Sequence, residues 1–184
     1  MKIEVYNLNK MLKITDKESS VGLNLISIRD VLDSPCEKYM ALDRHINKRS
    51  INAKIVYFDD ADRYRWGQGL EHPCITGRYS DGGEPTFFNE SIAKDIIDYV
   101  GPLWEKDHDV RILIHCWAGR SRSQAVAYWL NIYYNLILTT DIESFNWNNA
   151  RNVTEKIHFN CDVLKVFTNL YGSKTNEIQS SVQQ

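Results

Sequence analysis

The sequence lacks the features that would place it outside ordinary folded proteins. It has only four prolines and nine glycines in 184 residues, and it contains no internal repeat. Hydrophobic residues make up 43% and charged residues 25%, which are values typical of soluble globular chains and exclude a largely disordered or fibrous protein. Residues 1–13 mix lysine and glutamate with short apolar pairs, which is neither a signal peptide nor a membrane span. We therefore expect a cytoplasmic protein without a membrane segment.

The chain also lacks a strong charge of one sign and any metal-binding spacing. Its formal net charge is -2 and no lysine and arginine run resembles a nucleic-acid tail, so we expect no nucleic-acid partner. The widely spaced cysteines predict free thiols rather than a disulfide framework: Cys36, Cys74, Cys116 and Cys161. The histidines show no i, i+4 pairing, so the sequence predicts neither a metal nor a cofactor: His45, His72, His108, His115 and His158. The oligomeric state stays open.

Short apolar runs alternate with amphipathic segments along the chain. Runs rich in branched and aromatic residues predict four strands, of which the last three are apolar enough to be buried on both faces: Ile3–Tyr6, Leu23–Ile28, Lys54–Phe58 and Val110–His115. Helices are predicted at Glu37–Ile46, at Ser91–Val100 with Gly101–Pro102 as the stop, at Ser123–Leu138, and around Val163, Phe167 and Leu170 with Gly172 as the cap.

This alternation predicts an α/β fold with a central, mainly parallel sheet of about four to five strands flanked by helices. Residues 1–172 are expected to form a single domain, and residues 173–184, which are polar and without a period, a flexible C-terminal tail. Trp66–Pro85 carries five glycines and is expected to be a long loop, a kind of segment that is usually functional or disordered.

The most informative segment is 112–123, which reads ILIHCWAGRSRS. A buried strand runs into His115 and Cys116, five residues follow, and Arg122 then opens a helix. A cysteine with an arginine six positions later is weak evidence by itself. The added histidine, glycine and serine, with a strand before and a helix after, reduce chance agreement to about one in several thousand at average residue frequencies.

Phosphate chemistry explains this arrangement. A short loop between a strand end and a helix N-terminus turns backbone N–H groups inward, here those of Trp117, Ala118, Gly119, Arg120 and Ser121, and the helix dipole adds positive potential. The same field favours the thiolate of Cys116, which is the nucleophilic form. The planar fork of Arg122 can hold two phosphoryl oxygens, and Ser123 can donate its hydroxyl toward the sulfur. His115 has a supporting role in the loop.

The segment HCWAGRSRS resembles the signature loop of the cysteine-based protein-tyrosine and dual-specificity phosphatases, in the form found in compact bacterial and viral members. The likeness is strongest over Ile112–Leu130 and looser over Leu23–Gly172. It implies a phosphatase fold, a phosphocysteine intermediate on Cys116, phosphate binding by Arg122, and a phosphorylated protein, most often at phosphotyrosine, as substrate. It also implies that Asp60, in the segment YFDDAD, is the general acid.

Several carboxylates compete for the role of general acid. Asp59, Asp60 and Asp62 follow the third predicted strand, and Asp81 and Glu84 lie in the glycine-rich loop. Strand alternation gives Asp59 and Asp60 opposite facings, so at most one of them points over the loop. Asp60 is our first choice, although its distance of 56 residues from Cys116 is longer than in compact members of the family.

Other residues near the motif have ordinary alternatives. Trp66 could line a substrate pocket or simply pack. Arg78 and Arg120 could contact a second anionic group, although Arg78 is more typical of a solvated surface. Two rival functions stay open: a phosphate-binding module without catalysis, and a phosphatase acting on RNA 5′-ends or phosphoinositides. The low content of extra basic residues in the loop and the negative net charge argue against the second rival.

Overall fold

The computed structural model describes residues 1–31, 36–61, 83–119, 121–134, 137–140 and 160–181. Within them the chain forms one five-stranded sheet in the order β3-β2-β4-β1-β5, and all neighbouring strands are parallel. The strands are β1 (Lys2–Asn7), β2 (Asn24–Arg29), β3 (Asn52–Tyr57), β4 (Arg111–Cys116) and β5 (Ile137–Thr140). The predicted α/β class and the predicted parallel sheet are confirmed.

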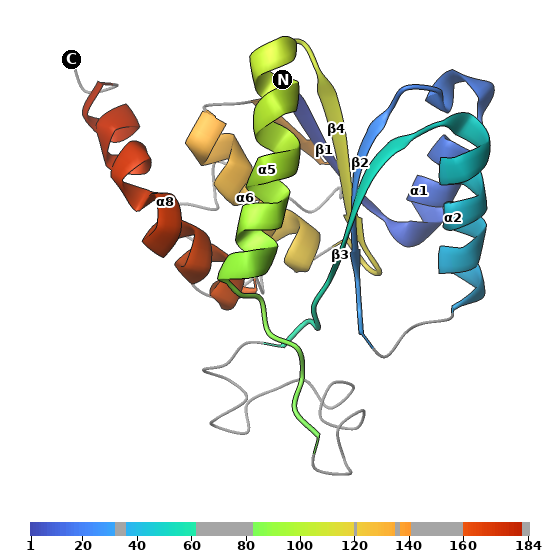
Figure 1. Ribbon diagram of the computed structural model, residues 1–184, viewed down its shortest axis with the longest axis horizontal. Coiled ribbons are helices and arrows are strands. Elements are labelled where there is room, and N and C mark those ends of the chain that lie inside the picture. Colours follow the sequence, from blue (N-terminus) through green and yellow to red (C-terminus); the bar gives the residue numbers. More distant parts are fainter. Residues whose placement is uncertain (32–35, 62–82, 120, 135–136, 141–159, 182–184) are drawn as a thin grey trace.

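Helices cover both faces of this sheet, as Figure 1 shows. On one face lie α1 (Leu8–Thr15) and α2 (Glu37–Arg49), and on the other α5 (Glu90–Lys106), α6 (Arg122–Tyr134) and α8 (Cys161–Ser181). A short 3-10 turn, η1, spans Glu18–Ser20. In the described part of the chain, no helix combines the length and the apolar character needed to cross a membrane.

Side-chain alternation along the strands builds two cores. In β4, Ile112 and Ile114 belong to the core under α5, α6 and α8, whereas Leu113 belongs to the core under α1 and α2. Successive residues of a strand point to opposite faces, so a strand covered on both sides is apolar throughout, as β4 is. Parallel pairing brings the carboxyl ends of β1, β2, β3 and β4 to one edge of the sheet, where open α/β sheets bind ligands.

One predicted strand differs from its expected burial. Lys54–Phe58 is predicted to be buried on both faces, but β3 is the edge strand, and of its six residues only Val56 is buried, three are half-buried and two are exposed. An edge strand has a neighbour on one side only, and its outer side chains therefore reach solvent. β1, in contrast, lies between β4 and β5, and its Ile3, Glu4 and Val5 are buried.

The helix predicted over Glu37–Ile46 continues only three residues further, to Arg49, but the ends of the other three predicted helices lie further from their expected positions. α5 does not stop at Gly101–Pro102 but continues to Lys106, because Leu103 packs against the core and the ring of Trp104 lies 5.8 Å from that of Tyr134. These contacts outweigh the helix hydrogen bond that Pro102 cannot donate.

The other two helices whose predicted ends are wrong are α6 and α8. The helix predicted over Ser123–Leu138 ends at Tyr134, because Ile137 and Leu138 join β5 and pair with Lys2 and Ile3 of β1. The predicted cap Gly172 is an interior residue of α8, and the positive φ of a glycine cap occurs among the described glycines only at Gly22 and Gly119. The boundary between a domain of residues 1–172 and a tail of residues 173–184 stays a prediction.

Candidate functional site

The predicted nucleophile lies at the carboxyl end of the sheet. β4 ends at Cys116, and α6 begins at Arg122. Cys116 is buried, and its Sγ lies 3.1 Å from the Oγ of Ser123, a hydrogen-bonding distance for a sulfur and a hydroxyl. The first turn of α6 therefore brings the hydroxyl of Ser123 to the sulfur, the relationship that the sequence predicted for this pair.

The loop between Cys116 and Arg122 packs tightly against the end of β1. Gly119 has φ +68°, and a Cβ on it would lie 2.8 Å from the backbone N of Asn7 and from the backbone C and O of Tyr6. Leu8 N–H donates to the carbonyl of Trp117 at 3.1 Å. The position therefore requires glycine both for its backbone conformation and for its lack of a side chain.

Gln124 also fixes the loop, and sequence reasoning did not find it. Its side chain is 1% exposed, and its Nε2 donates to the carbonyl of Gly119 at 3.1 Å. A glutamine in the first turn of a helix is unremarkable in sequence. Only its position under the loop reveals that it holds a backbone carbonyl.

Arg122 is 3% exposed and is held by three hydrogen bonds. Its Nη1 donates to Asp30 Oδ1 at 2.6 Å and to the carbonyl of Phe58 at 2.8 Å, and its Nη2 donates to Asp30 Oδ2 at 3.1 Å. Asp30 follows β2, the strand next to β4, and sequence reasoning did not single it out. The signal was available, since an acidic residue directly after a buried parallel strand lies at the same edge as Cys116.

These bonds leave one edge of the guanidinium for an anion. A guanidinium carries five N–H donors, and the end-on pair from Nη1 and Nη2 binds Asp30. The side-on pair is formed by Nε and the second hydrogen of Nη2, and Nε has no acceptor among the described residues although it is buried. A side-on fork of this kind matches two oxygens of a phosphate or carboxylate.

Charge stabilises the protonated state of Arg122. Burial lowers the pKa of its guanidinium, but the negative charges of Cys116, Asp30 and Asp60 outweigh burial and leave that pKa above its ordinary value. The arginine is thus a permanent cation in a site that three acidic groups surround.

His115 is the buried neighbour of the cysteine. It is fully buried, and the ring of Tyr39 lies 6.3 Å from its ring. Burial lowers the pKa of His115 to about 3, and the positive charges of Arg29 and Arg122 act in the same direction. A neutral imidazole with this environment fits the supporting role predicted for His115 and not that of a base at neutral pH.

The two described aspartates after β3 have different surroundings. Asp60 Oδ1 accepts a hydrogen bond of 2.5 Å from the Oγ of Ser121, a loop residue. Asp59 is buried and accepts from the backbone N–H groups of Thr86 at 2.8 Å and Val31 at 3.3 Å. Asp59 therefore joins two chain segments, whereas Asp60 reaches the loop. The opposite facings expected from strand alternation agree with this division.

Asn160 fixes the segment that follows Asp60. This residue is 3% exposed, and its Nδ2 donates to the carbonyl of Ala61 at 3.1 Å, while its Oδ1 accepts from the N–H of Val163 in α8 at 3.3 Å. The contact links the start of α8 to the aspartate segment.

Some predicted residues lie outside the described part of the chain. These are Asp62, Trp66, Cys74, Arg78, Asp81 and Arg120. Glu84 is described and exposed, Trp117 is 42% exposed at the loop, and Cys36 and Cys116 are free thiols. Among the described residues, no group of three or more histidine, cysteine, aspartate or glutamate side chains could hold a metal ion.

The site therefore combines a buried thiol, a hydroxyl beside it, a fixed arginine fork and a carboxylate at the loop. Such a set can bind an anion and offers a nucleophile and a proton donor on one edge of a sheet. Comparison with known proteins adds no relative: no protein-family model, no curated protein and no solved structure matches this chain.

Proposed function

We propose that this chain is a cysteine-dependent phosphatase that hydrolyses phosphate monoesters, foremost phosphotyrosine in proteins. The observation that carries the proposal is the arginine fork at the cysteine. Asp30 and the Phe58 carbonyl hold Arg122 through its end-on nitrogens, and its side-on edge is left for a phosphate. The Cys-x5-Arg spacing, the Cys116–Ser123 contact of 3.1 Å and the glycine that the loop requires support the same conclusion.

In the first step the thiolate of Cys116 attacks phosphorus. The S–P bond forms and the bond from phosphorus to the leaving oxygen breaks, while the protonated carboxyl of Asp60 gives its proton to that oxygen. Arg122 and the loop amides of Trp117, Ala118, Gly119, Arg120 and Ser121 bind the phosphoryl oxygens as charge moves onto them. Ser121 engages Oδ1 of Asp60, and Oδ2 is the oxygen that carries the proton in this proposal.

In the second step water hydrolyses the phosphocysteine. The carboxylate of Asp60 takes a proton from the water, the new P–O bond forms, and the S–P bond breaks to release inorganic phosphate. Ser123 lies where its hydroxyl can stabilise the departing thiolate of Cys116. The reaction needs no cofactor, because the cysteine, the acid and the arginine supply each proton and charge.

A phosphate-binding module without catalysis explains the site less well than an enzyme does. Such a module needs the loop and Arg122 but no proton donor, and Asp60 lies within hydrogen-bonding distance of the loop residue Ser121. We further propose that the enzyme acts in the cytoplasm, since a thiolate nucleophile requires a reducing compartment and Cys36 and Cys116 are free thiols.

One experiment tests the proposal directly. The purified chain is mixed with an aryl phosphate, quenched at early times, and its peptides are analysed by mass spectrometry. We expect turnover together with a phosphoryl adduct on the Cys116 peptide, and neither in the Cys116→Ser variant. Turnover without the adduct would contradict the covalent mechanism, and an absence of turnover would contradict the proposed phosphatase activity.

A substrate panel then identifies the class of phosphate ester. It contains matched phosphotyrosine and phosphoserine peptides, an RNA with a 5′-triphosphate, and a phosphoinositide headgroup. We expect the phosphotyrosine peptide to give the highest kcat/KM. A higher value for the RNA or the headgroup would reassign the substrate while keeping the mechanism.

A further inference from the structure

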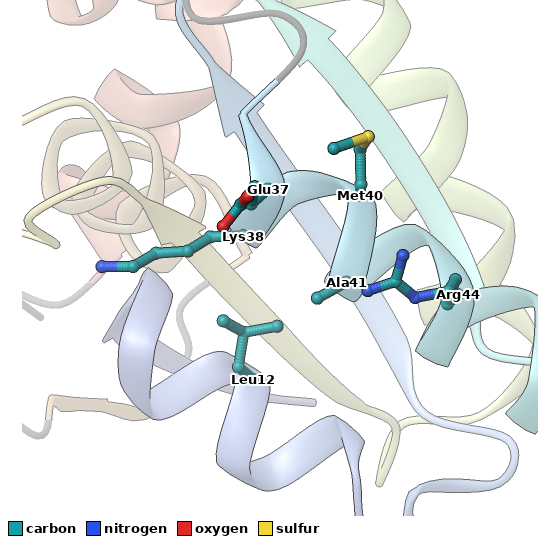
Figure 2. Close-up of a pocket in the computed structure, with 6 residues that line it drawn as sticks. All are labelled: Leu12, Glu37, Lys38, Met40, Ala41 and Arg44. Atoms are coloured by element: carbon teal, nitrogen blue, oxygen red, sulfur yellow. The ribbon is translucent and has the colours of Figure 1, made fainter.

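A groove lies between α1 and α2, on the face of the sheet opposite α5, α6 and α8. Figure 2 shows it, with Leu12 pointing from α1 toward α2, which carries the other five lining residues. Its volume is about 430 Å³, within the range of pockets that hold small ligands or a few side chains. The lining residues are Leu12, Glu37, Lys38, Met40, Ala41 and Arg44.

The groove combines an apolar centre with basic ends. Leu12 and Ala41 are half-buried, and Met40 is 42% exposed. Lys38 and Arg44 lie at opposite ends of the groove in Figure 2, and both are exposed. Apolar and cationic groups in this arrangement suit an occupant with an apolar side chain between carboxylates.

The charge of these two helices differs from that of the whole chain. The chain has a formal net charge of -2, yet α1 and α2 together carry six basic residues and two acidic ones. One of the acidic residues, Asp43, is already paired with Arg29 at 2.5 Å, whereas neither Lys38 nor Arg44 forms an ion pair with a residue that the structure describes. This surface therefore attracts acidic partners.

One lining residue of the groove, Lys38, contacts the loop that follows Cys116. The Nζ of Lys38 lies 5.0 Å from the centre of the Trp117 ring, a cation–π distance, and the ring of Tyr39 packs edge-on at 6.1 Å from Trp117. Trp117 belongs to the loop and is exposed. A chain whose phosphorylated residue enters the loop could thus pass over Trp117 and Lys38 into the groove.

We propose that this groove binds an acidic, apolar-anchored segment of the protein substrate, next to the phosphorylated residue. The proposal rests on the proposed phosphatase function and adds the substrate feature that the enzyme recognises. The anchor fills the space between Leu12, Met40 and Ala41, and carboxylates of the segment face Lys38 and Arg44. A nucleic acid fits less well, because none of the described residues that line the groove is aromatic and could stack on bases, and Glu37 would face its phosphates.

Binding is tested without catalysis, on the Cys116→Ser protein. The probes are a short fluorescent peptide that places leucine between glutamates, the same peptide with glutamine for glutamate, and an oligouridylate of similar length. We expect the acidic peptide to bind best and Arg44→Glu to weaken its Kd by about tenfold. Met40→Asp should weaken it similarly, whereas the matched exposed-site controls Lys94→Glu on α5 and Val21→Asp should not.

Kinetics distinguishes failure of this proposal from failure of the phosphatase function. In otherwise wild-type protein, Arg44→Glu and Met40→Asp should lower kcat/KM for a phosphotyrosine peptide flanked by glutamate and leucine, and leave turnover of a small aryl phosphate unchanged. If wild type turns over both substrates and the groove variants match it, the docking proposal is wrong. If wild type turns over neither, the phosphatase function fails and the binding assay alone decides the groove. Tighter binding of the oligouridylate, or a dimer that Met40→Asp dissociates, would assign the groove to another occupant.

Discussion

Asp30 binds Arg122 end-on, with both carboxylate oxygens accepting from the two terminal nitrogens of the guanidinium, at 2.6 and 3.1 Å. The two residues come from different strand ends, after β2 and after β4, and both are buried. A buried arginine is stable only when its charge is paired, and the planar carboxylate fixes the plane of the fork as well. The side-on edge is therefore oriented before any anion binds.

We predict that Arg122→Lys loses most of the activity although it keeps the positive charge. An ammonium cannot present two parallel N–H groups to a phosphoryl group while also binding Asp30 and the Phe58 carbonyl. The expected loss in kcat/KM for an aryl phosphate is about 10²-fold or more, comparable to the loss of an oxyanion donor.

Arg29→Lys is the matched control for that variant. Arg29 is also buried and forms a fork with the carboxylate of Asp43 on α2, and its Nε donates to the Oγ of Ser27 in β2, so none of these hydrogen bonds involves Cys116. Both variants should lose some stability in urea unfolding, and only Arg122→Lys should lose most of the turnover. Equal rates for wild type and Arg122→Lys would exclude a fork-dependent mechanism.

Cys116→Ser should abolish turnover and keep substrate binding. The hydroxyl occupies nearly the same space beside Ser123 but is not ionised near neutral pH, so the nucleophile is lost and the anion site is not. The checks are turnover of an aryl phosphate and calorimetric binding of a phosphotyrosine peptide. Activity of this variant above that of a heat-denatured control would show that the thiolate is not the nucleophile.

Asp60→Asn should slow substrates in proportion to how poor their leaving group is. We expect phenyl phosphate or phosphotyrosine to lose about 10²- to 10⁴-fold in kcat, because their phenoxide needs a proton. An aryl phosphate with a strongly acidic phenol should lose far less. Single-turnover rates for the two substrates measure the difference.

Asp59→Asn is the control, and it should behave differently. Asp59 accepts from the backbone N–H groups of Thr86 and Val31, so its loss should lower stability and slow both substrates by a similar factor. Asp62→Asn completes the series. Leaving-group dependence in the Asp62 variant and none in the Asp60 variant would move the general acid to Asp62.

Gly119→Ala should damage the loop more than a glycine substitution of similar backbone geometry elsewhere. Both Gly119 and Gly22 have positive φ, but only at Gly119 does a Cβ meet backbone atoms, at 2.8 Å, and at Gly22 nothing lies within 4 Å. Gly22→Ala should cost about 1 kcal/mol of stability from its backbone conformation. Gly119→Ala should cost at least about 1 kcal/mol more, from overpacking against β1, and should also lose turnover. Equal unfolding free energies for the two variants would contradict the close approach of loop and strand.

His115 should make the protein less stable in mild acid. Its pKa falls from 6.5 to about 3 on folding, so the unfolded chain binds a proton that the folded chain does not. Stability is full above about pH 6.5 and is lost as the pH falls toward 3, by about 2 kcal/mol at pH 5 for this one group. Urea unfolding at pH 7 and pH 5 should show this loss in the exposed-site control His108→Gln and a smaller one in His115→Gln. The same slope in both variants would mean that His115 does not titrate in this way.

Much of the fold was predictable because the residue pattern within a short segment is enough to indicate a strand. The four predicted strands occur within two residues of their expected limits, since each carries a short run of branched and aromatic residues that favours a strand. The helix ends were less predictable. α5 continues past Pro102 because Leu103 and Trp104 contact residues that are distant in the sequence. The pattern around Ile137 and Leu138 predicts a helix, but these residues pair with β1 and form β5.

The sequence by itself determined the strand–loop–helix motif with Cys116, Arg122 and Ser123, because these residues are close along the chain and local geometry alone brings them together. Only the tertiary structure decided which distant side chains complete the site. Asp30 and Asn160 form their contacts through buried polar groups that must find partners, and the packing of the elements determines which partners are near. The same packing separated Asp59, which holds two backbone segments, from Asp60, which reaches the loop.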